Sequence, residues 1–81
     1  MYYTYIVVNS NGSEYQVGVT TNIQRRKKIL CSLDPGCKLV YYEEFEKSEK
    51  ATERENILLE LPKPLIKELI DETNPMWINL E

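Results

Sequence analysis

The sequence predicts a small α+β protein, a three-stranded antiparallel sheet flanked by about three helices in the order β-β-α-β-α-α. Three observations support this fold class. Three short segments are rich in Tyr, Ile, Val and Thr, which favour strands. The turn residues Asn11-Gly12 join the first two of these segments as a hairpin. Apolar residues at helical spacing fill most of the remaining chain. With 81 residues, we expect one small domain spanning 1–81.

The hairpin comprises strands at 2–9 and 14–19. Because successive side chains of a strand point to opposite faces, Tyr3 and Tyr5 share one face of the first strand. On the second strand Gln16 and Gly18 share a face, and Tyr15 points the other way. A third strand is predicted over 38–45, after the turn at 34–36.

The first helix is predicted to begin at Thr21, which with Gln24 forms a capping-box pattern, and to end near residue 30 or 31. Ser48 is the expected N-cap of the second helix, which the prolines at 62 and 64 end. The last helix is expected over about 64–72. Residues 74–78 are expected to pack back as an extended tail, with Trp77 as a core residue.

The absence of histidine limits the chemistry available to this chain. Ser-His-Asp, Cys-His and His-metal sites cannot be built without it. Any hydrolysis must therefore use tyrosine, lysine, carboxylates and a metal ion.

The cysteines and the apolar pattern predict a cytoplasmic location. Cys31 and Cys37 lie close together in the chain, and free thiols are the expected state for a cytoplasmic protein. Two thiols without histidine make a zinc site unexpected. No apolar stretch is long enough to span a membrane, and nothing in the N-terminal residues resembles an export signal.

Charge is distributed unevenly around a net value of -3. Residues 1–40 carry five basic against two acidic side chains, whereas residues 41–60 carry three against seven. The basic residues cluster in one helical turn, Arg25, Arg26, Lys27 and Lys28, which are the candidate nucleic-acid contacts. DNA is therefore an expected partner, but weak binding is predicted. The glutamates of residues 43–53 form either a protein-binding face or ordinary solvated charge.

Five widely separated residues carry a family resemblance. Tyr5 lies in Tyr3-Thr4-Tyr5, Gln16 in Gln16-Val17-Gly18, and Arg26 closes Asn22-Ile23-Gln24-Arg25-Arg26. Further on come Arg54-Glu55 and Asn74-Pro75-Met76-Trp77. The ordered set resembles the GIY-YIG nuclease domain, in particular its small single-domain bacterial branch, which is related to the N-terminal domain of the excision-repair nuclease.

The resemblance implies catalytic roles for Tyr5, Gln16, Arg26, Glu55 and Asn74. It implies that Glu55 binds Mg²⁺ or Mn²⁺, that Arg26 holds the phosphate and that Tyr5 positions the attacking water. Asn74 would brace the site. The implied activity is metal-dependent hydrolysis of DNA phosphodiester bonds, as in DNA repair. Each residue also has an ordinary structural explanation: a packed tyrosine, a surface charge or a turn asparagine.

Two departures from the family pattern leave a second hypothesis open. Gln16 stands where the second motif has tyrosine, and a neutral amide cannot act as a general base. Leu30 stands where a histidine or tyrosine follows the helix arginine. The alternative is a degenerate scaffold that binds nucleic acid or protein without cutting. A homodimer is a further alternative, through the third strand's edge or the apolar stretch 58–65.

Overall fold

The computed structural model describes residues 1–80 and confirms the predicted fold class and element order. The strands are β1 (Tyr2–Val8), β2 (Tyr15–Thr20) and β3 (Lys38–Phe45). The helices are α1 (Ile23–Leu33), α2 (Ser48–Glu60) and α3 (Lys63–Thr73). None of the helices in the described part of the chain is long and apolar enough to cross a membrane.

The three strands form one antiparallel sheet in the order β2-β1-β3. The register places Tyr5 of β1 opposite Gly18 of β2 and Tyr42 of β3, and places Val7 opposite Gln16. Since directly paired residues share a face, Tyr5, Gly18 and Gln16 lie on the same side of the sheet. This arrangement is the one predicted from strand alternation.

An irregularity in β3 interrupts that alternation. Ile6 pairs with Tyr41 but Val7 pairs with Leu39, so Val40 is an extra residue in the β3 ladder. As a result, Val40 and Tyr41 both belong to the same buried cluster, whereas Leu39 belongs to the cluster on the other side.

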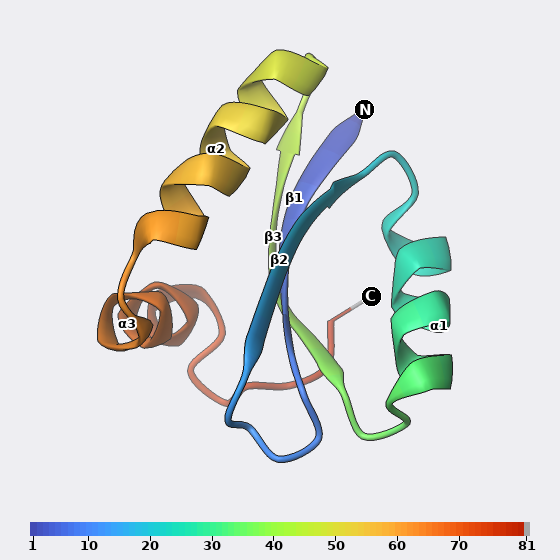
Figure 1. Cartoon of the computed structure of the whole chain (residues 1–81), viewed down its shortest axis with the longest axis vertical. Helices are drawn as coiled ribbons and strands as arrows, with labels where there is room; N and C mark the ends of the chain where they lie inside the picture. The colour runs from blue at the N-terminus through green and yellow to red at the C-terminus, as the bar shows by residue number, and fades with distance from the viewer. Residues whose placement is uncertain (81) are drawn as a thin grey trace.

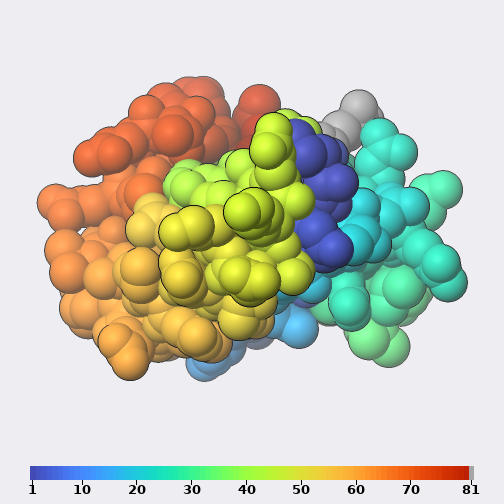
Figure 2. Space-filling model, turned by 90° about the horizontal axis from the view of Figure 1, so that it is seen from above, coloured from blue at the N-terminus to red at the C-terminus, as the bar shows by residue number. Residues whose placement is uncertain are grey.

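The sheet lies between two layers of helix (Figure 1). Helices α2 and α3 cover one face, where Ile6, Leu58 and Ile70 are buried together. Helix α1 covers the other face, where Tyr5 and Leu30 are buried together. Seen from above, the start of β1 lies between the two helical layers (Figure 2).

Both predicted N-caps are wrong by one residue. Helix α1 is capped by Asn22, whose Oδ1 accepts the Arg25 N–H at 3.0 Å, and Thr21 lies outside the helix. Asparagine is among the best N-cap residues, so it takes that place once the chain leaves β2. Ser48 is already inside α2; Lys47 occupies the cap position without a side-chain hydrogen bond.

The C-terminal segment begins with a turn and not with the extended chain predicted for it. The Trp77 N–H donates to the Asn74 carbonyl at 2.9 Å, and Trp77 has a positive φ of 53°. Its half-buried ring packs against the α2–α3 core and donates to Asp71, so Trp77 is only a peripheral core residue. The chain then crosses behind β2 in the view of Figure 1 to reach the α1 side, where the Leu80 N–H donates to the Leu39 carbonyl.

Candidate active site

Tyr5 is the centre of the candidate site because its ring lies across β2. It is 4% exposed, and its phenol covers Gly18 so closely that a β-carbon added there would lie 2.7 Å from the ring carbon Cζ. The same β-carbon would overlap the hydroxyl oxygen. Glycine at position 18 therefore allows the Tyr5 hydroxyl to reach across an edge strand.

Two opposite charges act on this hydroxyl. Burial raises the pKa of Tyr5 above its ordinary value, the charge of Arg26 lowers it, and the charge of Glu55 raises it. Both charges therefore act on the phenol, although Arg26 belongs to α1 and Glu55 to α2, on opposite faces of the sheet. The phenol is held neutral at ordinary pH, so its hydroxyl can both donate and accept a hydrogen bond.

The rotation of α2 explains how Glu55 reaches this position. Ala51 is fully buried, and its carbonyl accepts the Thr4 hydroxyl of β1 at 2.8 Å. Successive helix residues are about 100° apart around the helix axis. Residues 54 and 55, three and four positions after Ala51, therefore lie on opposite sides of the point where Ala51 touches β1. Arg54 is directed toward β3, where it meets Glu43. Glu55 is consequently on the β2 side, toward the Tyr5 hydroxyl.

A polar network fixes this rotation. Arg54 Nε and the Tyr41 hydroxyl both donate to the same oxygen of Glu43, each at 2.6 Å. The pKa of Arg54 is raised chiefly by its hydrogen bond to Glu43. Arg54 is therefore occupied by Glu43 and does not neutralise its neighbour Glu55. Leu58 is buried in this orientation, whereas the next residue, Leu59, is 60% exposed.

The half-buried carboxylate of Glu55 makes no hydrogen bond or ion pair with the residues described, so its oxygens are available. No group of three or more acidic, cysteine or histidine side chains gathers within residues 1–80. This donor set fits Mg²⁺ or Mn²⁺, because a hard divalent ion commonly takes one or two carboxylates and completes its shell with water and phosphate oxygens.

The basic run of α1 is divided between two hollows. Arg25 and Arg26 line one of about 300 Å³ with Thr20 and Ile29. Lys27 and Lys28 line a different pocket, and Lys27 donates to the Leu80 carbonyl at 2.7 Å. The helical turn thus separates the four residues, and the two arginines share a hollow that the two lysines do not line.

Gln16 and Leu30, the two departures from the family pattern, line one pocket of about 190 Å³. Gln16 is exposed and pairs with Val7. This pair is the next one along the same face of the sheet after Gly18 and Tyr5. Leu30 is buried against Tyr5 and Val7. Glu14, Asp34 and Tyr15 also line this pocket, so titrating groups are present in it, but the positions of Gln16 and Leu30 supply none.

Asn74 lies away from the other site residues. It is 5% exposed at the end of α3, and its Nδ2 donates to the carbonyls of Val40 and Ile78. Its Oδ1 accepts the Ile78 N–H. No described contact joins Asn74 to Tyr5, Arg26 or Glu55. The side chain fixes the C-terminal turn to β3.

Comparison with protein families identifies the type of domain. The model of the GIY-YIG catalytic domain matches residues 1–71. The chain belongs to the GIY-YIG family. Its domain type indicates a nuclease-like function and DNA binding in general terms. No curated protein and no solved structure matches the chain.

Sequence reasoning missed two residues that shape the GIY-YIG site. Gly18 was noted only for its face, although a glycine inside a strand signals a close approach by another group. Arg54 was treated as part of a motif, but its contact with Glu43 orients the helix that carries Glu55. The role of Gly18 could be recognised from the sequence, because a glycine interrupts the strand. The role of Arg54 could not, because it depends on a contact with Glu43 on another element.

Proposed function

We propose that this protein is a GIY-YIG-type endonuclease that hydrolyses DNA phosphodiester bonds with Mg²⁺ or Mn²⁺, at a reduced rate. The proposal is supported by the family match over residues 1–71, and by the charges of Arg26 and Glu55, which act from opposite faces of the sheet on the buried hydroxyl of Tyr5. The cation Arg26, the anion Glu55 and the neutral Tyr5 hydroxyl, which can donate or accept a hydrogen bond, form a set suited to phosphoryl transfer.

Each side chain has a role that follows from its surroundings. Arg26, on the rim of the 300 Å³ hollow, would hold two phosphate oxygens through its planar guanidinium. The neutral Tyr5 hydroxyl would donate to a phosphate oxygen or accept from the attacking water. Gln16 would orient water through its amide but would not remove a proton. The reduced rate follows, since a missing general base costs about 10²–10⁴-fold.

Glu55 is the residue that would hold the divalent ion. When bound, such an ion supplies Lewis-acid stabilisation of the charge that develops on a phosphoryl oxygen. Asn74 would act at a distance, by keeping the end of α3 and the C-terminal turn in place against β3.

The second candidate function is a non-catalytic scaffold that binds nucleic acid or protein. The observation that favours it is the shared pocket of Gln16 and Leu30, which contains no titrating group at the two positions where the family has polar rings. The split of the basic run between two hollows also predicts weak electrostatic attraction to DNA.

The deciding experiment is cleavage of labelled single-stranded, duplex and branched DNA with Mg²⁺ or Mn²⁺. We expect slow cleavage by the native protein and none by Glu55→Ala. The matched control is Glu53→Ala on the same helix, because Glu53 is exposed and pairs only with Lys50 among the residues described. Glu53→Ala should cleave at the native rate.

The same assay separates the two candidates. Cleavage that survives in Glu55→Ala would refute the assignment of Glu55. If the folded native protein does not cleave but Gln16→Tyr/Leu30→His does, the remaining site is competent, and the residues at these two positions account for the missing activity. If neither cleaves, the endonuclease proposal is rejected in favour of the binding module.

A further inference from the structure

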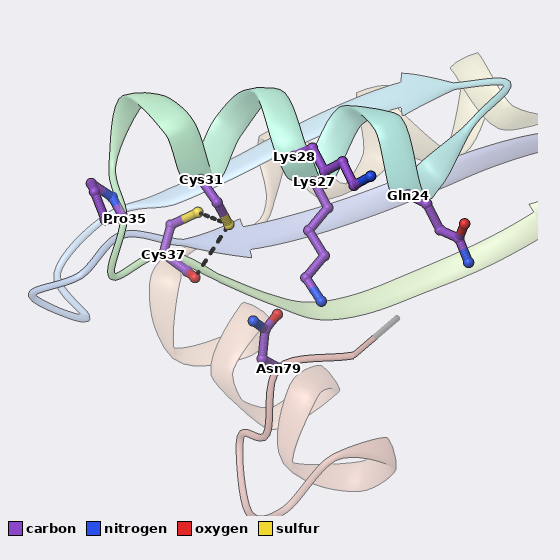
Figure 3. A pocket seen from close by; sticks show the side chains of 7 residues that line it. All are labelled: Gln24, Lys27, Lys28, Cys31, Pro35, Cys37 and Asn79. Atoms are coloured by element: carbon purple, nitrogen blue, oxygen red, sulfur yellow. Dashed lines mark hydrogen bonds between the residues drawn. The ribbon is translucent and has the colours of Figure 1, made fainter.

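The two thiols meet at the C-terminal end of α1. Cys31 lies in the helix and Cys37 directly precedes β3, and their sulfur atoms are 2.9 Å apart (Figure 3). Disulfide bonds have a sulfur–sulfur distance of about 2.05 Å. Both cysteines are free, and a small movement is sufficient to join them.

The two sulfur atoms differ in access. Both cysteines line one pocket, but Cys37 is only 5% exposed, whereas Cys31 is half-buried. Burial, helped by the hydrogen bond with Cys31, raises the pKa of Cys37 to about 12. Because the thiolate is the nucleophile, Cys31 is the residue placed to react first with an incoming molecule, and Cys37 is placed to react with Cys31.

The pocket beside Cys31 has a volume of about 490 Å³, within the range of small-molecule sites. Its polar lining combines two ammonium groups with two amides, contributed by Lys27, Lys28, Gln24 and Asn79 (Figure 3). Among residues 1–80, no carboxylate lines it. This chemistry is complementary to a small molecule that bears carboxylates and peptide groups.

We propose that Cys31 and Cys37 form a thiol–disulfide exchange site for a small anionic disulfide, with oxidised glutathione as the probe. The Cys31 thiolate attacks one sulfur of the probe, so that a Cys31–glutathione bond forms and the probe's own S–S bond breaks. The Cys37 thiolate then attacks the Cys31 sulfur and displaces the second glutathione. Two protein thiols are oxidised to one disulfide, one glutathione disulfide is reduced to two thiols, and the two cysteine protons pass to the released thiolates.

The test uses the reduced full chain, oxidised glutathione and, for comparison, the positively charged disulfide cystamine. Rates are measured by intact mass and normalised to each reagent's rate with an unstructured cysteine peptide. The native protein should lose two hydrogen masses and retain no glutathione. Cys37→Ser should accumulate one glutathione at Cys31. Cys31→Ser should react with oxidised glutathione more slowly than both the native protein and Cys37→Ser. The normalised rate should favour glutathione by several-fold, and Lys28→Gln should reduce that preference.

Brief labelling of the native protein with iodoacetamide keeps the test independent of variant folding. Peptide mapping should find the label on Cys31 before Cys37. The proposal is overturned if both thiols survive while the peptide is consumed, if only intermolecular dimers form, or if Cys37 is labelled first. Equal normalised rates for glutathione disulfide and cystamine would overturn the proposal that the site prefers an anionic disulfide.

Discussion

Replacing Gly18 by alanine gives the most direct test of the Tyr5 site. The added β-carbon would lie 2.7 Å from Cζ of Tyr5 and 3.0 Å from Cε2, in addition to its overlap with the hydroxyl. Tyr5 is buried under α1 with Leu30, so the ring cannot move without disturbing that packing. The β-carbon must therefore displace the phenol from its position over β2.

The expected magnitude follows from overpacking. An extra carbon in a filled site costs about 1–3 kcal/mol of stability. Without the clash, the substitution would have the opposite sign, because replacing glycine at a compatible position stabilises by about 0.4–1 kcal/mol. Displacement of the hydroxyl by about 1 Å should also lower any cleavage rate by about 10²-fold.

Urea denaturation of the native protein and of Gly18→Ala measures the first effect. Tyr5→Phe removes the oxygen nearest to the added carbon, so Gly18→Ala should cost less in the Tyr5→Phe background than in the native protein. A neutral or stabilising Gly18→Ala, or strict additivity of the two changes, would refute the close approach of Tyr5 to Gly18.

Three other substitutions probe the surroundings of the site. Asn74→Ala should lower the free energy of unfolding by about 2–3 kcal/mol, because each of its three side-chain hydrogen bonds contributes about 1 kcal/mol. Urea denaturation measures this loss, and a value under about 0.5 kcal/mol would contradict the prediction. Glu43→Gln should cost about 1 kcal/mol by removing the charge that holds Arg54, and the cost should shrink at high salt if the contact is ionic. Under reducing conditions the native protein should lose stability as pH rises from 9.0 toward 12, since the unfolded Cys37 thiol ionises while the folded one keeps its proton. The loss should approach about 1.4 kcal/mol per pH unit relative to Cys37→Ala, and equal pH profiles would exclude a raised pKa.

Much of the fold could be predicted because the signals are local. Period-two strands and the Asn11-Gly12 turn define the hairpin, and they place Tyr5, Gln16 and Gly18 on one face, as the structure confirms. The N-caps differ from the prediction by one residue because adjacent polar residues, such as Thr21 and Asn22, compete for that role. The turn at 74–77 depends on Asn74 reaching the backbone of β3, a contact that no local pattern encodes.

The order of the elements, the family resemblance and the chemistry open to a chain without histidine all follow from the sequence alone. Which charges meet depends on the tertiary structure. The opposite directions of Arg54 and Glu55 depend on how α2 is rotated over β1, and that rotation is set by Ala51 and by Glu43 on another strand. Local periodicity determines which residues share a face of a helix or strand, but contacts between residues far apart in the sequence determine what each face packs against.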